Sequence, residues 1–117
     1  MLGTILIALI AILHVYILVL EMFLWDKPYG LKAFGNTLEK AQLTKVLAQN
    51  QGLYNGFLAA GLFWSLLAPA GFALAIANFF LGCVLVAGIY GGLTASKKII
   101  YIQAVPALIT LIVVNLF

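Results

Sequence analysis

The sequence predicts an all-α membrane protein, an antiparallel bundle of four transmembrane helices with the N- and C-termini outside. Three observations lead to this fold class. Hydrophobic residues make up 66% of the 117 residues and charged residues only 8%, and the mean hydropathy is +1.21. A soluble domain of this length covers most of its surface with polar groups, and this chain has too few. A span needs about 20 apolar residues, so four spans would use nearly the whole chain.

The expected helices are separated by segments that favour turns. Proline and glycine occur together in DKPYG at residues 26–30 and in APAG at residues 68–71, and two lysines end the polar segment at residues 94–98. The chain is therefore expected to form one domain, residues 1–117, with helices at residues 2–25, 37–68, 72–93 and 99–117.

Two local features refine these helices. Asn36 and Glu39 have the N-cap and N3 spacing of a helix start, so the second helix is expected to begin in water and to enter the membrane near residues 46–49. Pro106 lies inside the fourth helix and is expected to kink it, because proline lacks the N–H that the helix needs.

The lysines predict the orientation in the membrane. The chain has six lysines and no arginine, and all six lie between the membrane-crossing parts of the first and second helices or between the third and fourth helices, at positions 27, 32, 40, 45, 97 and 98. With four spans these two connections share one side. The positive-inside rule places that side in the cytoplasm. We therefore expect a multi-pass protein of the cell membrane.

Several classes of function have no support in the sequence. The net charge of +3 is not gathered into the basic face that nucleic-acid binding requires. The single Cys83 excludes an intrachain disulfide and a CxxC site. Phosphate-binding loops, Ser-His-Asp sets and metal-ligand clusters are not visible, so no cofactor and no metal are expected.

The first helix carries two ionisable residues on one stripe. His14 and Glu21 are seven residues apart, about 10 Å along the helix axis. An ionisable side chain in hydrocarbon is costly and usually faces the bundle interior. The pair is interpreted either as a site that handles protons or a ligand, or as a hydrogen-bonded structural pair.

The second helix offers polar partners at a similar depth, since it enters the membrane where the first helix leaves. Gln51, Tyr54 and Asn55 fall within an arc of about 100°. Interhelical polar bonds, worth about 0.6 kcal/mol each, are the structural alternative. Tyr90 is alternatively an interfacial aromatic. The candidate ligand or proton site, open to the cytoplasm, comprises His14, Glu21, Gln51, Tyr54, Asn55, Tyr90 and Gln103.

Small residues recur at intervals of four on the second and third helices. Such stripes let helices approach closely in a membrane. We expect the second and third helices to pack on each other through them, with a homodimer as the alternative. The stripes are Gly52, Gly56 and Ala60; Cys83, Ala87 and Gly91; and Gly88 and Gly92.

One block resembles a known family. His14, Glu21 and Trp25, followed by NQGLYNGFLAAGL at residues 50–62, are similar to a family of small bacterial four-helix membrane proteins known as domain of unknown function 1304. The resemblance covers essentially the whole chain and is most specific in the NQGxYNG block. It implies a multi-pass membrane location and no particular activity.

Three functions fit these features. The first is a protein that binds or transports a small amphipathic molecule, with proton coupling through Glu21. In its size, its number of spans and the single glutamate of its first helix, the chain is similar to small multidrug transporters. The second is a membrane enzyme, isomerase- or oxygenase-like, in which Glu21 is an acid or base for a lipophilic substrate. The third is a structural or accessory subunit. The expected partners are the lipid bilayer and such a small ligand.

Overall fold

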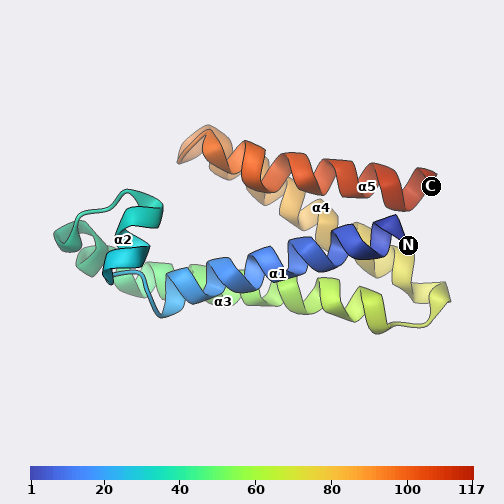
Figure 1. Cartoon of the computed structure of the whole chain (residues 1–117), viewed down its shortest axis with the longest axis horizontal. Coiled ribbons are helices and arrows are strands. Elements are labelled where there is room, and N and C mark those ends of the chain that lie inside the picture. Colours follow the sequence, from blue (N-terminus) through green and yellow to red (C-terminus); the bar gives the residue numbers. More distant parts are fainter. The chain divides into compact units, whose positions relative to one another are not determined.

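The computed structural model describes all 117 residues and is entirely helical, with no strands (Figure 1). The predicted all-α class is confirmed. Five α-helices and one π-helical turn follow one another along the chain: α1 Leu2–Met22, α2 Pro28–Phe34, α3 Leu38–Leu67, α4 Ala70–Thr94, η1 Ile100–Ala104 and α5 Val105–Leu116.

Two helices are long and apolar enough to cross a membrane, namely Leu2–Met22 and Ala70–Thr94. Residues Ile100–Leu116 form a shorter apolar helix. The third long helix, α3, has 30 residues and carries Glu39, Lys40 and Lys45 in its first turns. By length and composition, two of the four expected spans therefore meet the requirement.

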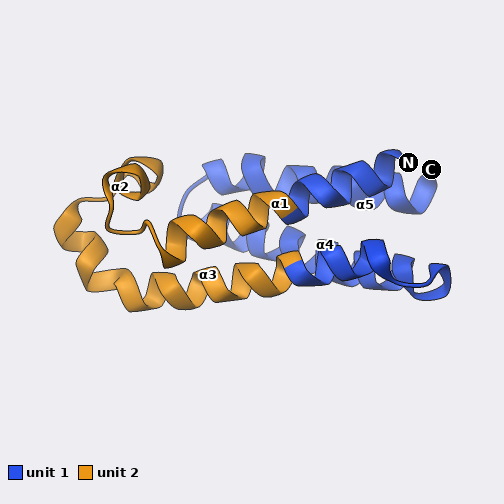
Figure 2. Cartoon of the chain, turned by 60° about the horizontal axis from the view of Figure 1, so that its bottom comes forward, with its two compact units in different colours: residues 1–11, 60–117 blue, residues 12–59 orange.

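The chain divides into two compact units, coloured separately in Figure 2. Unit 2 comprises residues 12–59, which are the second part of α1, all of α2 and the first part of α3. Unit 1 comprises residues 1–11 and 60–117, which include the start of α1, the end of α3, α4, η1 and α5.

In unit 2 the short helix α2 lies in a segment where only a connection was expected. It begins at Pro28, whose fixed φ and missing N–H suit a first helical position. It ends at Gly35, where φ is 65°, and the N–H of Asn36 returns to the carbonyl of Leu31. Asn36 thus ends α2 and does not cap α3. The hydroxyl of Thr37 accepts the N–H of Lys40 at 3.2 Å and begins α3 instead.

The residues that follow α1 are fixed to both neighbouring helices of unit 2. The indole N–H of Trp25 donates to the hydroxyl of Thr44 at 3.1 Å, and Lys45 pairs with Asp26 at 3.1 Å. The ring of Trp25 also packs on Phe34 of α2, with centroids 4.8 Å apart. These contacts tie the end of α1 to the start of α3.

In unit 1, glycines of α4 bring it close to the last helical segment. A Cβ at Gly88 would lie 2.7 Å from the backbone nitrogen of Ala104, and one at Gly92 would overlap Ile100. The stripe of Gly88 and Gly92 therefore packs on the fourth predicted helix, and its expected packing on the second is wrong. The homodimer stays a prediction.

A π-helical turn precedes Pro106, where the sequence predicted a kink. In this turn, Ile100–Ala104, the N–H of Val105 donates to the carbonyl of Ile100, five residues earlier. Proline has no N–H for the carbonyl four residues before it, so a wider turn at this point satisfies the backbone differently. α5 then starts with Pro106 in its first turn.

Candidate functional site

The candidate site centres on a hydrogen bond between α1 and α3 inside unit 2. The side-chain amide of Asn55 donates to Oε1 of Glu21 at 2.6 Å. The same amide nitrogen donates to the main-chain carbonyl of Gln51 at 3.2 Å, one helical turn earlier. An amide nitrogen has two hydrogens, so these two bonds use both of them and fix the direction of the side chain.

Two glycines explain why this bond can form. Gly52 is buried, and a Cβ placed on it would lie 3.2 Å from the Cβ of Glu21 and 3.3 Å from the carbonyl oxygen of Leu18. One turn later, a Cβ on Gly56 would lie 2.8 Å from Leu18. The backbone of α3 therefore approaches α1 closely here, as small residues allow. The stripe of Gly52 and Gly56 packs on the first predicted helix, and the expectation that it packs on the third is wrong.

The charge of Glu21 is matched by a dipole and not by a cation. Asn55 is neutral, and the ion pair of the chain joins Lys45 to Asp26. Glu21 is neither buried nor fully exposed, and it lies at the end of a helix whose other residues are largely apolar. Hydrogen bonds stabilise a carboxylate but leave its net charge in place. The site can therefore accept a positive charge or a proton.

The other predicted residues of unit 2 lie at different degrees of burial. His14 is fully buried on α1, two turns before Glu21. Gln51 contributes its main-chain carbonyl, while its side chain is exposed. Tyr54 is 54% exposed, and its ring lies against Phe57 with centroids 6.2 Å apart. The structure thus brings Glu21, Asn55 and the backbone of Gln51 together.

Tyr90 and Gln103 belong to unit 1, where each has local contacts. The amide of Gln103 donates to the carbonyl of Val84 at 3.3 Å and so connects η1 to α4. Tyr90 is 70% exposed, and its carbonyl accepts the hydroxyl of Thr94. In its own unit, Gln103 is a contact between helices.

Sequence reasoning missed the polar contacts at the end of α1. The hydrogen bond from Lys45 lowers the pKa of Asp26, and the positive charges of Lys45 and Lys27 add to this effect, although desolvation opposes it. Neighbouring Tyr16 and Tyr29 share a hydrogen bond between their hydroxyls. The signal was a dense run of polar and aromatic residues directly after the apolar helix, which was interpreted only as a turn.

A second missed contact lies in unit 1. The amides of Asn78 on α4 and Asn115 on α5 form two hydrogen bonds, at 3.1 and 2.6 Å. Two asparagines 37 residues apart carry no local pattern, so only the pairing of the helices makes this contact visible. The two side-chain amides thus link α4 and α5 by a reciprocal pair of hydrogen bonds.

Comparison with known proteins places the chain among relatives of similar length. It is 32% identical over 106 residues to the uncharacterized protein YpaA of Lactococcus lactis subsp. lactis (strain IL1403), covering 89% of this chain and 88% of that protein. No solved structure matches it. A family model described as "Protein of unknown function (DUF1304)" matches residues 8–115. With nearly its whole length matched, the chain belongs to the DUF1304 family.

Proposed function

We propose that this protein is a multi-pass protein of the cell membrane that binds or transports a small amphipathic cation at Glu21 and Asn55. One observation carries the proposal. The carboxylate of Glu21 receives the amide of Asn55 at 2.6 Å, between two helices that glycines hold close together, and no lysine pairs with it. The packing of α1 and α3 therefore fixes the position of an acidic side chain, Glu21, that forms no ion pair.

The exposed side chains support the membrane location. Monomeric soluble proteins rarely expose large contiguous apolar patches. In this chain aromatic and branched residues stand exposed along α4 and α5, among them Phe79 at 65%, Val86 at 67% and Ile109 at 50%. A hydrocarbon environment would cover them at no cost.

Four spans follow if α3 enters the membrane after its polar first turns and the π turn continues into α5 as one segment. Residues Ile100–Leu116 number 17, and a span of this length lies at the short end of what a bilayer accepts. All six lysines then lie on one side, which the positive-inside rule assigns to the cytoplasm, and both termini lie outside. Glu21 lies towards the lysine side of α1.

The charge of the site defines the ligand that we propose. A carboxylate in an apolar environment is costly unless it is paired or hydrated, and its natural complement is a cation. Apolar side chains of α1 lie next to Glu21 in this contact, with Leu18 against Gly56 and Met22 against Gly52. On α3 the exposed rings of Tyr54 and Phe57 add aromatic surface within two residues of Asn55. An organic cation with an apolar body satisfies both requirements. A proton and such a cation compete for one carboxylate, so binding of the cation releases the proton from those molecules in which Glu21 is protonated.

The test uses the full-length protein purified in detergent micelles and the lipophilic cation tetraphenylphosphonium as probe. Calorimetry in two buffers of different ionisation enthalpy measures both binding and the number of protons released. We expect the wild type to bind the probe with proton release and Glu21→Gln to lose binding, because the amide keeps the shape and removes the charge. Glu39→Gln, which removes an exposed acid from the start of α3, is the matched control and should bind as the wild type does.

Two outcomes would overturn the proposal. If a folded Glu21→Gln variant binds the probe as tightly as the wild type, the carboxylate is not the site. In the second outcome the wild type binds no probe, and the Glu21→Gln variant is only less stable than the wild type. The hydrogen bond from Asn55 to Glu21 is then a structural contact between α1 and α3.

A further inference from the structure

The short helix α2 of unit 2 is held across the end of α1. Figures 1 and 2 show it running across the direction of α1, at the point where that helix ends. Gly30 is buried, and a Cβ placed on it would overlap the carbonyl oxygen of Leu24, so α2 lies directly on the chain that follows α1. The hydroxyl of Tyr29 shares a hydrogen bond with that of Tyr16, six residues before the end of α1. The first turn of α2 is therefore fixed to the preceding chain at two points.

This arrangement places α2 along the membrane surface when α1 spans the bilayer. The membrane location is the one part of the proposed function on which this placement rests. Tryptophan and tyrosine are enriched where a span meets the headgroups, because their rings suit the hydrocarbon and their polar atoms suit water. Trp25 and Tyr29 lie at this level of the chain, directly after α1. The exposed rings of Phe23 and Phe34, at 64% and 41%, add apolar surface beside them.

Three lysines of the same region form no ion pair. Lys27 directly precedes α2, Lys32 lies within it, and Lys40 lies in the first turn of α3. All three are exposed, and the ion pair of the chain joins two other residues. Lys32 follows Tyr29 by three residues, so both side chains lie on one face of α2. Lysines combined with exposed aromatic rings are typical of a helix that lies in a membrane interface.

We propose that α2 and these three lysines bind the anionic headgroups of phospholipids in the leaflet that they face. A lysine ammonium group donates charge-assisted hydrogen bonds to phosphate oxygens. A zwitterionic lipid also has a phosphate, but its own ammonium group balances that charge, so the net attraction is to anionic lipids. A soluble acidic partner would use the lysines and leave the rings of Phe23 and Tyr29 uncovered, whereas a lipid covers both.

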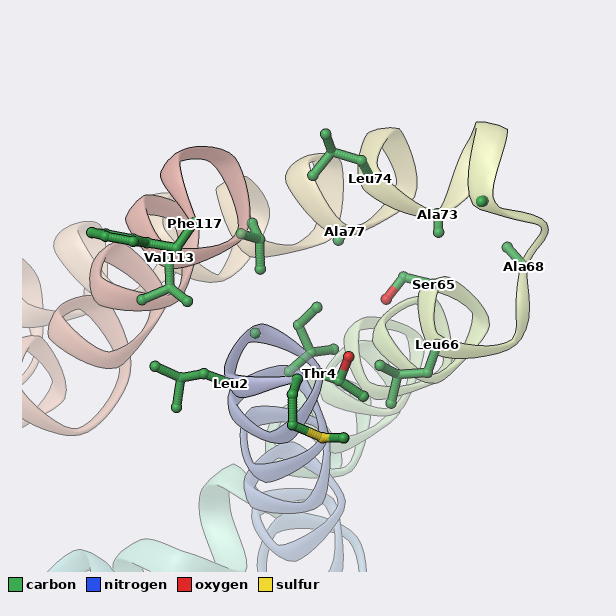
Figure 3. A pocket seen from close by; sticks show the side chains of 15 residues that line it. Leu2, Thr4, Ser65, Leu66, Ala68, Ala73, Leu74, Ala77, Val113 and Phe117 are labelled. Atoms are coloured by element: carbon green, nitrogen blue, oxygen red, sulfur yellow. The ribbon is translucent and has the colours of Figure 1, made fainter.

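A pocket in unit 1 differs from this surface in its charged groups. It has a volume of about 520 Å³, and Figure 3 shows side chains of α1, α3, α4 and α5 around it. Its lining includes Met1, with the terminal amine, and Phe117, with the terminal carboxylate, but no lysine. A positive and a negative group thus lie at the same pocket, and no excess of positive charge attracts an anionic headgroup there.

The test uses the full-length protein in detergent micelles with equal amounts of phosphatidylglycerol and phosphatidylcholine that have the same acyl chains. Native mass spectrometry counts the lipids of each kind that stay bound, and we expect the wild type to retain more phosphatidylglycerol. Lys27→Gln combined with Lys32→Gln should weaken this preference about fivefold for each lysine removed. Lys97→Gln combined with Lys98→Gln is the matched control. It removes the same charge from the connection after α4 and should weaken the preference less.

Lys32→Gln combined with Lys40→Gln keeps the test decisive if the first double variant does not fold. The proposal is overturned if a folded double variant of this region keeps the preference of the wild type, or if the control loses as much. Glycerol phosphate, which is the headgroup without acyl chains, should not displace the lipid at equal concentration. Displacement would show that the lysines bind a free phosphate and would overturn the lipid as the partner.

Failure of this proposal can be distinguished from failure of the proposed function. If the wild type retains both lipids equally, the lysine surface is refuted and the membrane location stands. If the wild type retains neither lipid, both the lysine surface and the membrane location are refuted. None of these substitutions changes Glu21 or Asn55, so binding of a cation there is tested separately.

Discussion

Asn55 of α3 donates its amide to Glu21 of α1 across 2.6 Å, and the same nitrogen donates to the carbonyl of Gln51. The second bond lies within one helix and orients the amide before the first is made. The acid therefore meets a donor whose direction is already fixed. We derive three predictions from this pair and from the contacts around it, and a fourth from the proposed orientation in the membrane.

Loss of the amide should leave a partly buried carboxylate without its hydrogen bond. Asn55→Ala is expected to lower the free energy of unfolding by about 1–3 kcal/mol, the usual cost of an unsatisfied buried group. A double-mutant cycle with Glu21→Ala should give a coupling above the average of about 0.6 kcal/mol for polar pairs in membrane helices, since one partner is charged. Unfolding in mixed micelles measures both. Asn50→Ala is the control, because its exposed amide bonds only to its own helix, and additive effects in the cycle would refute the coupling.

Two glycine-to-alanine substitutions should change the stability of the protein in opposite directions. In Gly52→Ala the new methyl group would overlap Met22 and lie 3.2 Å from the Cβ of Glu21, so α3 must move away from α1. We expect a loss of about 1–3 kcal/mol in stability. Gly82 has nothing within 4 Å of such a methyl group, so Gly82→Ala in α4 should be neutral or add up to about 1 kcal/mol. Thermal unfolding in detergent compares the two, and equal effects would contradict close packing at Gly52.

The pair of Asp26 and Lys45 should make stability depend on acid pH. Folding lowers the pKa of Asp26 through the hydrogen bond from Lys45, so the folded state favours the ionised acid. Its stabilising effect is complete above the unfolded pKa of about 3.9 and disappears as the pH falls through the lower, folded value. Asp26→Asn should therefore be less stable than the wild type at neutral pH, and the difference should vanish in strong acid.

Chemical unfolding of both proteins over an acid series measures this difference. Glu39→Gln is the matched control, because that exposed acid forms no ion pair, and it should follow the wild type more closely. A gap between wild type and Asp26→Asn that stays constant down to the most acid sample would refute the linkage.

The proposed orientation can be tested with single cysteines in a Cys83→Ser background. Gln42→Cys lies in the lysine-bearing segment of α3, and Ala70→Cys lies at the start of α4. In intact cells a membrane-impermeant maleimide should label position 70 and not position 42, which should react only after the cells are opened. Labelling of both positions, or of position 42 alone, in intact cells would contradict four spans with external termini.

The sequence was sufficient to predict the helical class and to predict that Glu21 and Asn55 face each other. Both follow from regular spacing, since hydrophobic runs mark helices and polar residues at intervals of three or four mark a face. The NQGLYNG block combines both signals, with amides on one side and glycines on a neighbouring one. Helix periodicity therefore predicted a contact between residues 34 positions apart.

Which helices pair was harder to predict. Small-residue stripes indicate that a helix will be approached closely but not by which neighbour, and Gly52 and Gly88 both received a different partner from the expected one. The short helix α2 was also missed, because seven residues give too few turns for a periodic signal. Its ends were encoded in Pro28, which was interpreted only as a turn residue, and in Gly35, to which the sequence analysis assigned no role.

The π-helical turn before Pro106 has a consequence for comparison with relatives. A turn of this kind holds one residue more than an α-turn, and each residue rotates the helix by about 100°. A relative that lacks one residue within Ile100–Ala104 could replace this turn with an α-turn and keep every later contact of α5, including Asn115 with Asn78. The same deletion within α5 would turn Asn115 away from its partner. A one-residue gap in an alignment should therefore leave the packing of α5 unchanged when it falls in this turn, and should disrupt that packing when it falls a few residues later.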